Sequence, residues 1–243
     1  MTRLLTIDKL SCGYDGIAVV RDLSLHVDAG EVVALLGPNG AGKTTTLMTI
    51  SGIIRVLEGS IELLGQPVPK LRKAYQAAQW GLVHVPENRG LFYQLTVDEN
   101  LKLAPGLDHP DLDQAYSQFP PLKPLGNRNA GTLSGGEQQM LALARAFLAS
   151  PKLLMVDEMS LGLAPVIYEN LMPMVRKAAD DGGAGVLLVE QHTDLALAQS
   201  DRAYVLNHGD LVLQGSAADL LRDRHLIDAA YMGSEALDDE TTD

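Results

Sequence analysis

The sequence predicts an α/β fold with a mostly parallel sheet at its core, an antiparallel β subdomain at the N-terminal end, and a helical insert. The continuous apolar runs "EVVALLG", "KLLMVDE" and "GVLLVEQ" are typical of strands buried on both faces of a parallel sheet. Two earlier strand-like segments, 4–12 and 17–27, are joined by a turn at "GYDG". Residues 88–131 lack such runs, and we expect mainly helices and loops there.

Local patterns place the remaining elements. We expect further strands at 59–65 and 80–85, and a hairpin at 202–215 around His208 and Gly209. We expect helices at 43–54, 71–79, 96–104, 111–119 and 140–149, and two short ones from about Ala217 and Leu226. Thr96 and Glu99 form a capping box at the start of one of these helices. Residues 120–131 are expected to be a loop.

Length and composition predict one globular domain. The 243 residues, 46% of them hydrophobic, can bury a substantial core. We therefore treat 1–243 as a single domain, with 88–131 as an inserted helical subdomain and 234–243 as an acidic, solvated tail.

The same numbers exclude several classes of protein. A net charge of -12 disfavours a nucleic-acid binder that relies on neutralising phosphates. No run reaches the roughly 18 apolar residues of a membrane span, and Asp8 and Lys9 interrupt any export signal. One cysteine, Cys12, cannot form an internal disulfide, which fits a reducing cytoplasm.

The motif "GPNGAGKT" predicts a phosphate-binding loop between an apolar strand and a helix. Its glycines allow backbone N–H groups to turn toward phosphate oxygens, and the following helix directs its positive end at them. Lys43 would contact the β- and γ-phosphates, and the Thr44 hydroxyl would hold Mg²⁺. The expected ATP-binding residues are Gly37, Pro38, Asn39, Gly40, Ala41, Gly42, Lys43, Thr44 and Thr45.

Two carboxylates end the strand in "LLMVDE". Asp157 is expected to hold Mg²⁺ through water, because Mg²⁺ keeps several of its waters. Glu158 follows directly and is expected to act as the general base on the attacking water. Alone, the pair could be an acidic strand end, but the phosphate-binding loop favours a role in nucleotide chemistry.

The motif "LSGGEQQM" predicts a second anion site at a helix start. Ser134 is the expected N-cap, and Glu137 follows three residues later. Gly135 and Gly136 disfavour helix, so they suggest that backbone approaches a ligand closely. One chain thus carries two phosphate-binding elements about 90 residues apart.

These three motifs, in this order and spacing, resemble the nucleotide-binding subunit of an ABC transporter, a P-loop NTPase. The resemblance covers nearly the whole chain. It implies ATP and Mg²⁺ as cofactors and two such domains paired head to tail. Each ATP would then lie between the phosphate-binding loop of one chain and the signature Ser134, Gly135, Gly136 and Glu137 of the other. The helical insert would dock a membrane subunit.

The family pattern also assigns weaker signals. Tyr14 matches the aromatic residue that stacks on adenine. Glu87 stands where most members have a glutamine, in a loop that senses the γ-phosphate and contacts the permease, and its carboxylate could still hold Mg²⁺ or water. Met159 replaces the usual proline, and Ala164 replaces the usual aspartate of the loop after Glu158. Communication between sites through that aspartate is therefore in question.

The stretches "VPE", "LTVDENL", "SLGLAP" and "LLVEQ" resemble the ATPases of branched-chain amino-acid uptake systems, particularly the shorter of their two ATPases. This implies a second ATPase subunit, two membrane permeases, an external substrate-binding protein, and a peripheral place on the cytoplasmic face of the membrane. ATPases for urea or short-chain amides look similar, so the substrate stays open. A soluble ABC-type ATPase of ribosomes or DNA, or a regulatory protein without turnover, fits less well, because the chain is acidic and keeps Lys43 and Glu158.

Most members of the family have a catalytic histidine after the last buried strand. Counted back from Asp201 and Arg202, that position falls on Gln191, and His192 lies one residue later. We therefore predict Gln191 as the residue facing the γ-phosphate. His192 could take that place only with a local shift of the loop.

Overall fold

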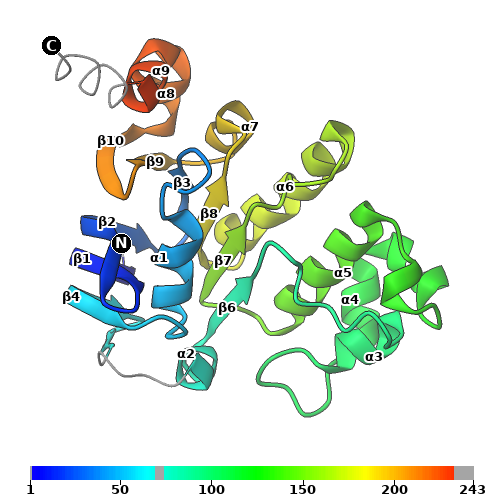
Figure 1. Ribbon diagram of the computed structural model, residues 1–243. Coiled ribbons are helices and arrows are strands. Elements are labelled where there is room, and N and C mark those ends of the chain that lie inside the picture. Colours follow the sequence, from blue (N-terminus) through cyan, green and yellow to red (C-terminus); the bar gives the residue numbers. More distant parts are fainter. Residues whose placement is uncertain (1, 69–73, 233–243) are drawn as a thin grey trace, which may run out of the picture.

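The computed structural model describes residues 2–68 and 74–232, and it confirms the predicted α/β fold class (Figure 1). Within these residues a six-stranded sheet has the order β10-β9-β3-β8-β7-β6. All neighbouring pairs in it are parallel except β10 with β9. Its strands are β3 (Val32–Leu36), β6 (Leu82–Val85), β7 (Leu153–Asp157), β8 (Gly185–Glu190), β9 (Arg202–Asn207) and β10 (Asp210–Ser216).

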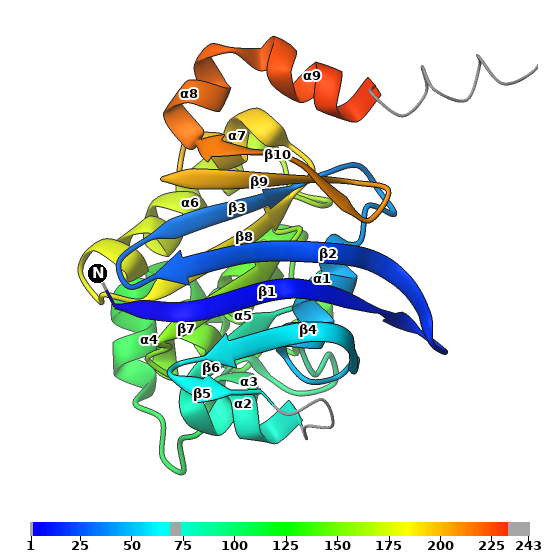
Figure 2. The same ribbon diagram turned by 90° about the vertical axis from the view of Figure 1, so that its left-hand side faces the viewer.

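A smaller antiparallel sheet forms the N-terminal part of the described chain, as predicted. Its order is β2-β1-β4-β5, and Figure 2 shows β2, β1 and β4 running across that side of the molecule. The strands are β1 (Arg3–Tyr14), β2 (Ile17–Asp28), β4 (Val56–Leu63) and β5 (Gln66–Pro67).

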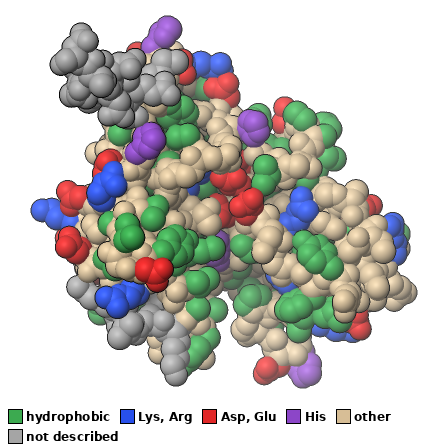
Figure 3. All heavy atoms as spheres, viewed as in Figure 1, with side chains coloured by type: hydrophobic (Ala, Val, Ile, Leu, Met, Phe, Trp, Pro, Cys, Tyr) green, Lys and Arg blue, Asp and Glu red, His purple; other side chains and the backbone are tan. Residues whose placement is uncertain are grey.

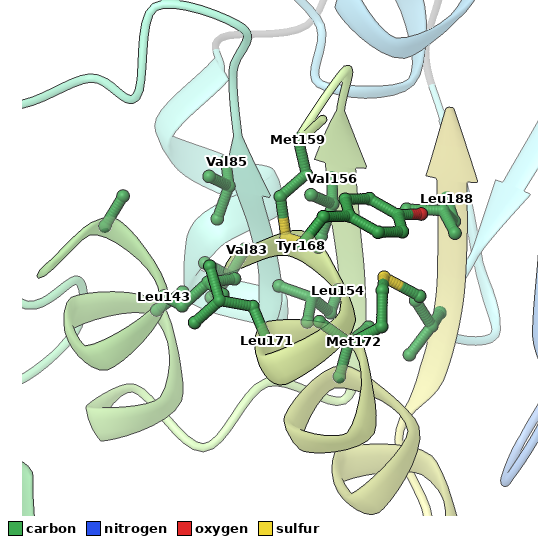
Figure 4. Packing of buried hydrophobic residues seen from close by; sticks show 14 of the residues in the cluster. Val83, Val85, Leu143, Leu154, Val156, Met159, Tyr168, Leu171, Met172 and Leu188 are labelled. Carbon is green, nitrogen blue, oxygen red and sulfur yellow. The ribbon is translucent and has the colours of Figure 1, made fainter. Parts of the chain in front are cut away.

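The larger sheet separates two hydrophobic cores. On β3, Val32, Ala34 and Leu36 belong to one core, whereas Val33 and Leu35 belong to the other. Both faces of this strand are buried because successive side chains of a strand point to opposite faces. The first core lies under the helices of the helical region and α6, where Met159 and Tyr168 pack over the strands (Figure 4). The second lies between the two sheets and α1.

The helices surround the larger sheet on both sides (Figure 1). They are α1 (Lys43–Ile50), α2 (Ala74–Trp80), α3 (Val97–Lys102), α4 (Leu112–Gln118), α5 (Gly135–Leu148), α6 (Pro165–Asp180), α7 (Thr193–Leu197), α8 (Ala217–Arg222) and α9 (Arg224–Met232). Two 3₁₀ helices, η1 (Pro120–Leu125) and η2 (Ala130–Thr132), lie before α5.

Several predicted boundaries differ from the structure. The helix expected at 43–54 ends at Ile50, and the chain turns at Gly52, which has φ 76°. Within 120–131, expected as a loop, residues 120–125 form η1 and η2 begins at Ala130. The start of the helix expected at 71–79 and the acidic tail 234–243 lie outside the described residues.

The topology determines where the chemistry-bearing residues meet. Strands β3, β6, β7 and β8 run parallel, so their carboxyl ends lie along one edge of the sheet. The phosphate-binding loop follows β3, Asp157 and Glu158 end β7, and Gln191 follows β8. Glu87 comes just after β6. Ligands of open α/β sheets bind at this edge.

Candidate nucleotide-binding and catalytic site

The phosphate-binding loop holds a conformation that only glycine permits at two places. Gly42 has φ 100°, and a Cβ there would lie 2.4 Å from Val20 Cγ2. A Cβ on Gly37 would lie 2.4 Å from the carbonyl oxygen of Leu206. Helix α1 therefore starts after a left-handed glycine, with no side chain capping its first turn. Its N-terminal N–H groups are directed at the cavity.

Lys43 lies at the floor of this cavity, with its side chain only 3% exposed. Its ammonium donates to the carbonyl oxygens of Gly37 at 2.8 Å and Pro38 at 3.1 Å. It also forms an ion pair with Glu158 Oε1 at 3.3 Å. These three contacts fix a buried positive charge beside the start of α1.

A cavity of about 290 Å³ brings nine of the predicted site residues together. Loop, strand ends and helix start all contribute to its wall. The predicted residues that line it are Asn39, Gly40, Gly42, Lys43, Thr44, Thr45, Glu87, Glu158 and Gln191. Acidic side chains gather near the middle of the face in Figure 3, between the sheet region and the helical region.

Asp157 lies at the end of β7 and is 2% exposed. Burial raises the pKa of its carboxyl to about 6, and the nearby carboxylates of Glu158 and Glu87 act in the same direction. A hydrogen bond with Thr44 and the charge of Lys43 oppose that rise. Its Oδ1 atom is buried without a hydrogen-bond partner. A buried carboxylate oxygen in this condition fits a bound cation.

The described residues contain no group of three or more histidine, cysteine or acidic side chains that could hold a metal ion. A cation at Asp157 would therefore need hydroxyl, water or phosphate oxygens as its other ligands. Mg²⁺ is usually bound in this manner, through one or two carboxylates together with waters and substrate phosphates. The residues present thus fit Mg²⁺ delivered with a nucleotide.

Glu158 and Gln191 lie together in the wall of the cavity. Glu158 has φ 45°, an uncommon left-handed conformation held by its N–H, which donates to Val189 O at 2.9 Å. Gln191 Nε2 donates to Glu158 Oε2 at 2.9 Å and also to Asn39 Oδ1. One amide therefore joins the carboxylate after β7 to the phosphate-binding loop.

His192 has a different environment. It is exposed, it does not line the cavity, and it occupies the N-cap position of α7 without a capping hydrogen bond from its side chain. The chain thus turns away from the site between Gln191 and His192. Of these two residues, Gln191 alone lines the cavity, and its contact with the γ-phosphate stays a prediction.

Sequence reasoning missed Glu190, the last residue of β8. Its carboxylate is fully buried and accepts hydrogen bonds from Ser160 N at 3.0 Å and Ser160 Oγ at 2.5 Å. Burial raises its pKa to about 7, and the charge of Glu158 contributes. Glu190 therefore ties the turn after Glu158 to the strand that carries Gln191. The sequence feature that could have identified Glu190 is a charged residue directly after four apolar residues.

The signature residues lie away from this cavity, at the start of α5. Ser134 Oγ accepts from Glu137 N at 3.3 Å, and Glu137 Oε2 accepts from Ser134 N at 2.7 Å, a complete capping box. Gly136 has a packing reason as well, because a Cβ there would lie 2.9 Å from Ile167 Cγ2 of α6. The close packing of α5 against α6 therefore also requires glycine at this position.

Two further sequence assignments have clear positions. Tyr14 is 51% exposed at the end of β1, and its hydroxyl lies 4.0 Å from Met48 Sδ of α1. Met159, in place of the family's proline, is buried in the core beside Tyr168 (Figure 4). An apolar side chain thus anchors the turn after Glu158.

A larger cleft of about 610 Å³ lies between α4, the end of α5 and the end of α6. Phe147, Pro151, Met174 and Lys177 contribute to its wall, and none of the predicted site residues does. We assign the nucleotide to the smaller cavity because the phosphate-binding loop, the carboxylates and the buried ammonium converge there.

Comparison with known proteins identifies the chain. A family model described as ABC transporter matches residues 20–160. This chain belongs to the ABC transporter ATPases. The ATPase is 41% identical over 240 residues to the high-affinity branched-chain amino acid transport ATP-binding protein BraG of Pseudomonas aeruginosa, covering 95% of this chain and 100% of that protein. It therefore binds adenine nucleotide and couples ATP hydrolysis to transport.

Two other relatives of this ABC transporter ATPase carry one shared and one different named role. It is 37% identical to the probable branched-chain amino acid transport protein LivF of Archaeoglobus fulgidus, over 88% of this chain and 92% of that one. It is 32% identical to the lipopolysaccharide export protein LptB of Escherichia coli, over 95% of this chain and 98% of that one. The common property of these relatives is ATP-driven transport.

Solved structures support the fold of this ATPase. The ATP-binding subunit of an ABC transporter is 30% identical and superposes with a TM-score of 0.78, covering 95% of this chain and 98% of that chain. A cassette crystallised as a dimer with ADP and Pi has a TM-score of 0.78 at 21% identity, over 88% of this chain and 99% of that one. That second likeness concerns the fold alone.

Proposed function

We propose that this ATPase powers the import of leucine, isoleucine and valine through a membrane permease. The observation that carries the proposal is the 41% identity to BraG over the whole of that protein. The LivF relative has the same named transport role at 37% identity. Identity to the lipopolysaccharide export relative is lower, at 32%.

We infer the following roles in nucleotide binding. Lys43 and the N-terminus of α1 hold the β- and γ-phosphates, because they supply a buried ammonium and uncapped N–H groups. Tyr14 stacks on the adenine from its exposed position. Thr44, Asp157 and Glu87 hold Mg²⁺, which would neutralise charge on the phosphates when bound. The buried, unpartnered Asp157 oxygen supports this placement.

Glu158 is the proposed general base for the attacking water. It takes a proton from that water as the water oxygen bonds to the γ-phosphorus. The bond from this phosphorus to the oxygen that bridges to the β-phosphate breaks, and ADP and phosphate are released. The amide of Gln191, hydrogen-bonded to Glu158 at 2.9 Å, holds the carboxylate in position and is placed to orient the water. Gln191 stays neutral at all pH values, so its role is positioning rather than proton transfer.

The signature residues Ser134 to Glu137 are proposed to bind the ATP held by a second ABC ATPase subunit. The start of α5 lies outside this chain's own cavity, which supports a role toward a nucleotide held by another chain. The similar fold of the cassette dimer with ADP and Pi supports such a pairing. The partner is a second ATPase of the same transporter.

The helical insert, 88–131, is proposed to dock the permeases. Four large hydrophobic side chains there are exposed by 40% or more: Phe92, Tyr93, Leu103 and Leu107. Figure 3 shows hydrophobic side chains exposed over this region. None of the helices in the described residues is long and apolar enough to cross a membrane. We propose that the ATPase binds, from the cytoplasmic face, two permease subunits that receive substrate from an external binding protein.

Uptake by the reconstituted transporter tests the proposed substrate. The ATPase is combined with its sister ATPase and permeases in vesicles, with the binding protein outside, and uptake of labelled leucine and labelled urea is measured. Leucine uptake that needs ATP and stops with Glu158→Gln is expected. Uptake of urea alone would replace the amino-acid proposal with urea or short-chain amide import.

A further inference from the structure

Arg89 is a residue that the sequence motifs leave without a role. It lies in a tight turn after β6, where Arg89 N donates to Pro86 O at 2.7 Å. Its φ is 66°, a conformation uncommon for a residue with a side chain. Glu87, within the same turn, lines the nucleotide cavity. A backbone movement at Glu87 would therefore reach the turn from which Arg89 extends.

The side chain of Arg89 reaches the other phosphate element. Its Nη1 donates to Gln138 Oε1 at 2.7 Å, and its Nε donates to Gln139 Oε1 at 3.2 Å. Both glutamines follow directly after the signature residues on α5. Gln139 is 3% exposed, so the guanidinium is fixed against a buried partner. Two bonds from one planar group define its orientation as well as its position.

Gln138 extends this contact to the segment before α5. Its Nε2 donates to Ala130 O at 3.1 Å and to Leu133 O at 3.3 Å. A single side chain thus binds Arg89 through its oxygen and the residues leading into the signature through its nitrogen. The start of α5 and the Glu87 turn are joined through two side chains.

The guanidinium also lies beside the signature backbone and the loop after Glu158. A Cβ built on Gly135 would lie 3.6 Å from Arg89 Nη2, and one on Gly162 would lie 4.0 Å from it. The loop that carries the general base and the start of α5 therefore both face Arg89. Arg145, which donates to Gly90 O at 2.7 Å, separately attaches the same turn to α5.

We propose that Arg89 is a positioning residue that couples the Glu87 turn to the signature helix within one chain. Nucleotide bound in a chain's own cavity then sets the orientation of Ser134 to Glu137. That orientation in turn determines how tightly these residues bind the partner's ATP. The proposal rests on the proposed function, in which Glu87 faces bound nucleotide and the signature faces the ATP of a second ATPase.

A reporter at the signature tests this coupling directly. The one natural cysteine, Cys12, is buried, so an environment-sensitive dye can be attached selectively at Thr132→Cys, an exposed position just before the signature. ATP is expected to change the dye signal in the otherwise unaltered chain. Arg89→Ala should abolish that change while ATP affinity stays within about twofold. Arg89→Lys, which cannot make both bonds, should behave like Arg89→Ala.

Turnover gives the second readout. At saturating ATP, the turnover rate of Arg89→Ala is expected to fall roughly 10–100-fold with little change in KM. The substitution disturbs the orientation of the signature residues and leaves nucleotide binding intact. The combined loss in the Arg89→Ala/Gln138→Ala double variant should be smaller than the sum of the two single losses in free energy, since both variants break the Arg89–Gln138 bond. Arg222→Ala removes an exposed arginine that pairs with Asp219 and serves as the matched control.

The outcomes separate the two proposals. An intact ATP response of the dye in Arg89→Ala, a parallel loss of ATP affinity, or additive losses in the double variant would overturn the coupling role. If the dye on the unaltered chain does not respond to ATP, although Glu158→Gln still traps a nucleotide-bound dimer, the coupling role of Arg89 is wrong and the proposed function stands. If Glu158→Gln traps no dimer, the proposed arrangement of the two ATPases fails first.

Discussion

The starts of α1 and α5 are both candidate phosphate sites, and they are built in opposite ways. Helix α1 begins after Gly42, with no capping side chain and no acidic residue in its first turn. Helix α5 begins with a complete capping box, in which Ser134 and Glu137 satisfy each other's backbone N–H groups. Lys43 adds a buried positive charge at α1, whereas α5 has the carboxylate of Glu137.

This difference shows what each helix start needs from its surroundings. The uncapped N–H groups of α1 gain stability when an anion binds, so nucleotide and loop stabilise each other. The start of α5 is already stable in the free chain, because its own residues cap it. The chain can thus present a preformed signature to another subunit, while its own cavity keeps donors free for phosphate.

The substitution with the largest expected effect tests whether ATP hydrolysis depends on the residues beside the start of α1 and not on the start of α5. Glu158→Gln keeps the size of the side chain but removes the base, so turnover should fall by about 10²–10⁴-fold. ATP should still bind, since Lys43 and the loop are unchanged. Steady-state hydrolysis and nucleotide binding measured on the same sample check this. Near-normal turnover would remove Glu158 from the role of base.

Substitutions at the N-cap residues of α5 and α1, Ser134 and Gly42, sharpen the comparison of the two helix starts. Ser134→Asp keeps a good N-cap but adds a negative charge, so the melting temperature should hold while turnover falls roughly 10–100-fold. Ser134→Ala should lose about 1 kcal/mol of stability.

Gly42→Ser should lower stability more than either Ser134 variant, because Gly42 has φ 100° and a Cβ there would lie 2.4 Å from Val20 Cγ2. A stable Gly42→Ser protein would contradict the glycine requirement at α1.

Gln191 and His192 provide a matched pair at the end of β8. Gln191→Ala removes the amide that joins Glu158 and Asn39, and turnover should fall about tenfold or more. His192→Ala alters an exposed side chain outside the cavity, so less than a twofold change in turnover is expected. The reverse order of effects would show that the loop shifts its register when ATP binds.

The smallest effect concerns stability and pH. Burial raises the pKa of Glu190 from its usual 4.5 to about 7. Between these values the folded chain holds the proton more tightly than the unfolded chain, so stability falls as pH rises through this window. Glu190→Gln should flatten that slope and increase stability above pH 7 by roughly 1–3 kcal/mol. Denaturant unfolding at several pH values measures it.

Glu169→Gln is the control for this prediction, because Glu169 is exposed on α6. It should leave the pH dependence of the unfolding free energy as it is in the natural chain. Asp157, whose pKa rises to about 6 for the same reason of burial, adds its own slope at lower pH in both proteins. An unchanged slope in Glu190→Gln would mean that the charged form of Glu190 is fully compensated by Ser160.

The sequence predicted the parts of the fold that have strong local signals. The apolar runs of β3, β7 and β8 and the turn before β2 lie where expected. Helix α6 received no assignment, because Pro173 and Pro165 interrupt its pattern, yet it packs Tyr168 and Leu171 into the core. The 3₁₀ helices at 120–132 were missed because proline and glycine there also fit a loop.

The same division holds for the site. Motifs with fixed spacing predicted Lys43 and Glu158, and the register counted back from Asp201 and Arg202 predicted Gln191. These three residues meet in one cavity. Glu190 and Arg89 were missed because their roles depend on residues far along the chain, Ser160 and Gln138. Such contacts are determined by the order of strands in the sheet, which no local pattern contains.

The strand order also has a consequence for synthesis. The strand that delivers the phosphate-binding loop, β3, pairs only with β8 and β9 among the described strands. At ribosomal rates of about 5–20 residues per second, its neighbours emerge roughly 10–30 s later. During that time a continuous apolar strand has open edges on both sides. The growing chain therefore depends on protection from aggregation until its C-terminal third completes the sheet.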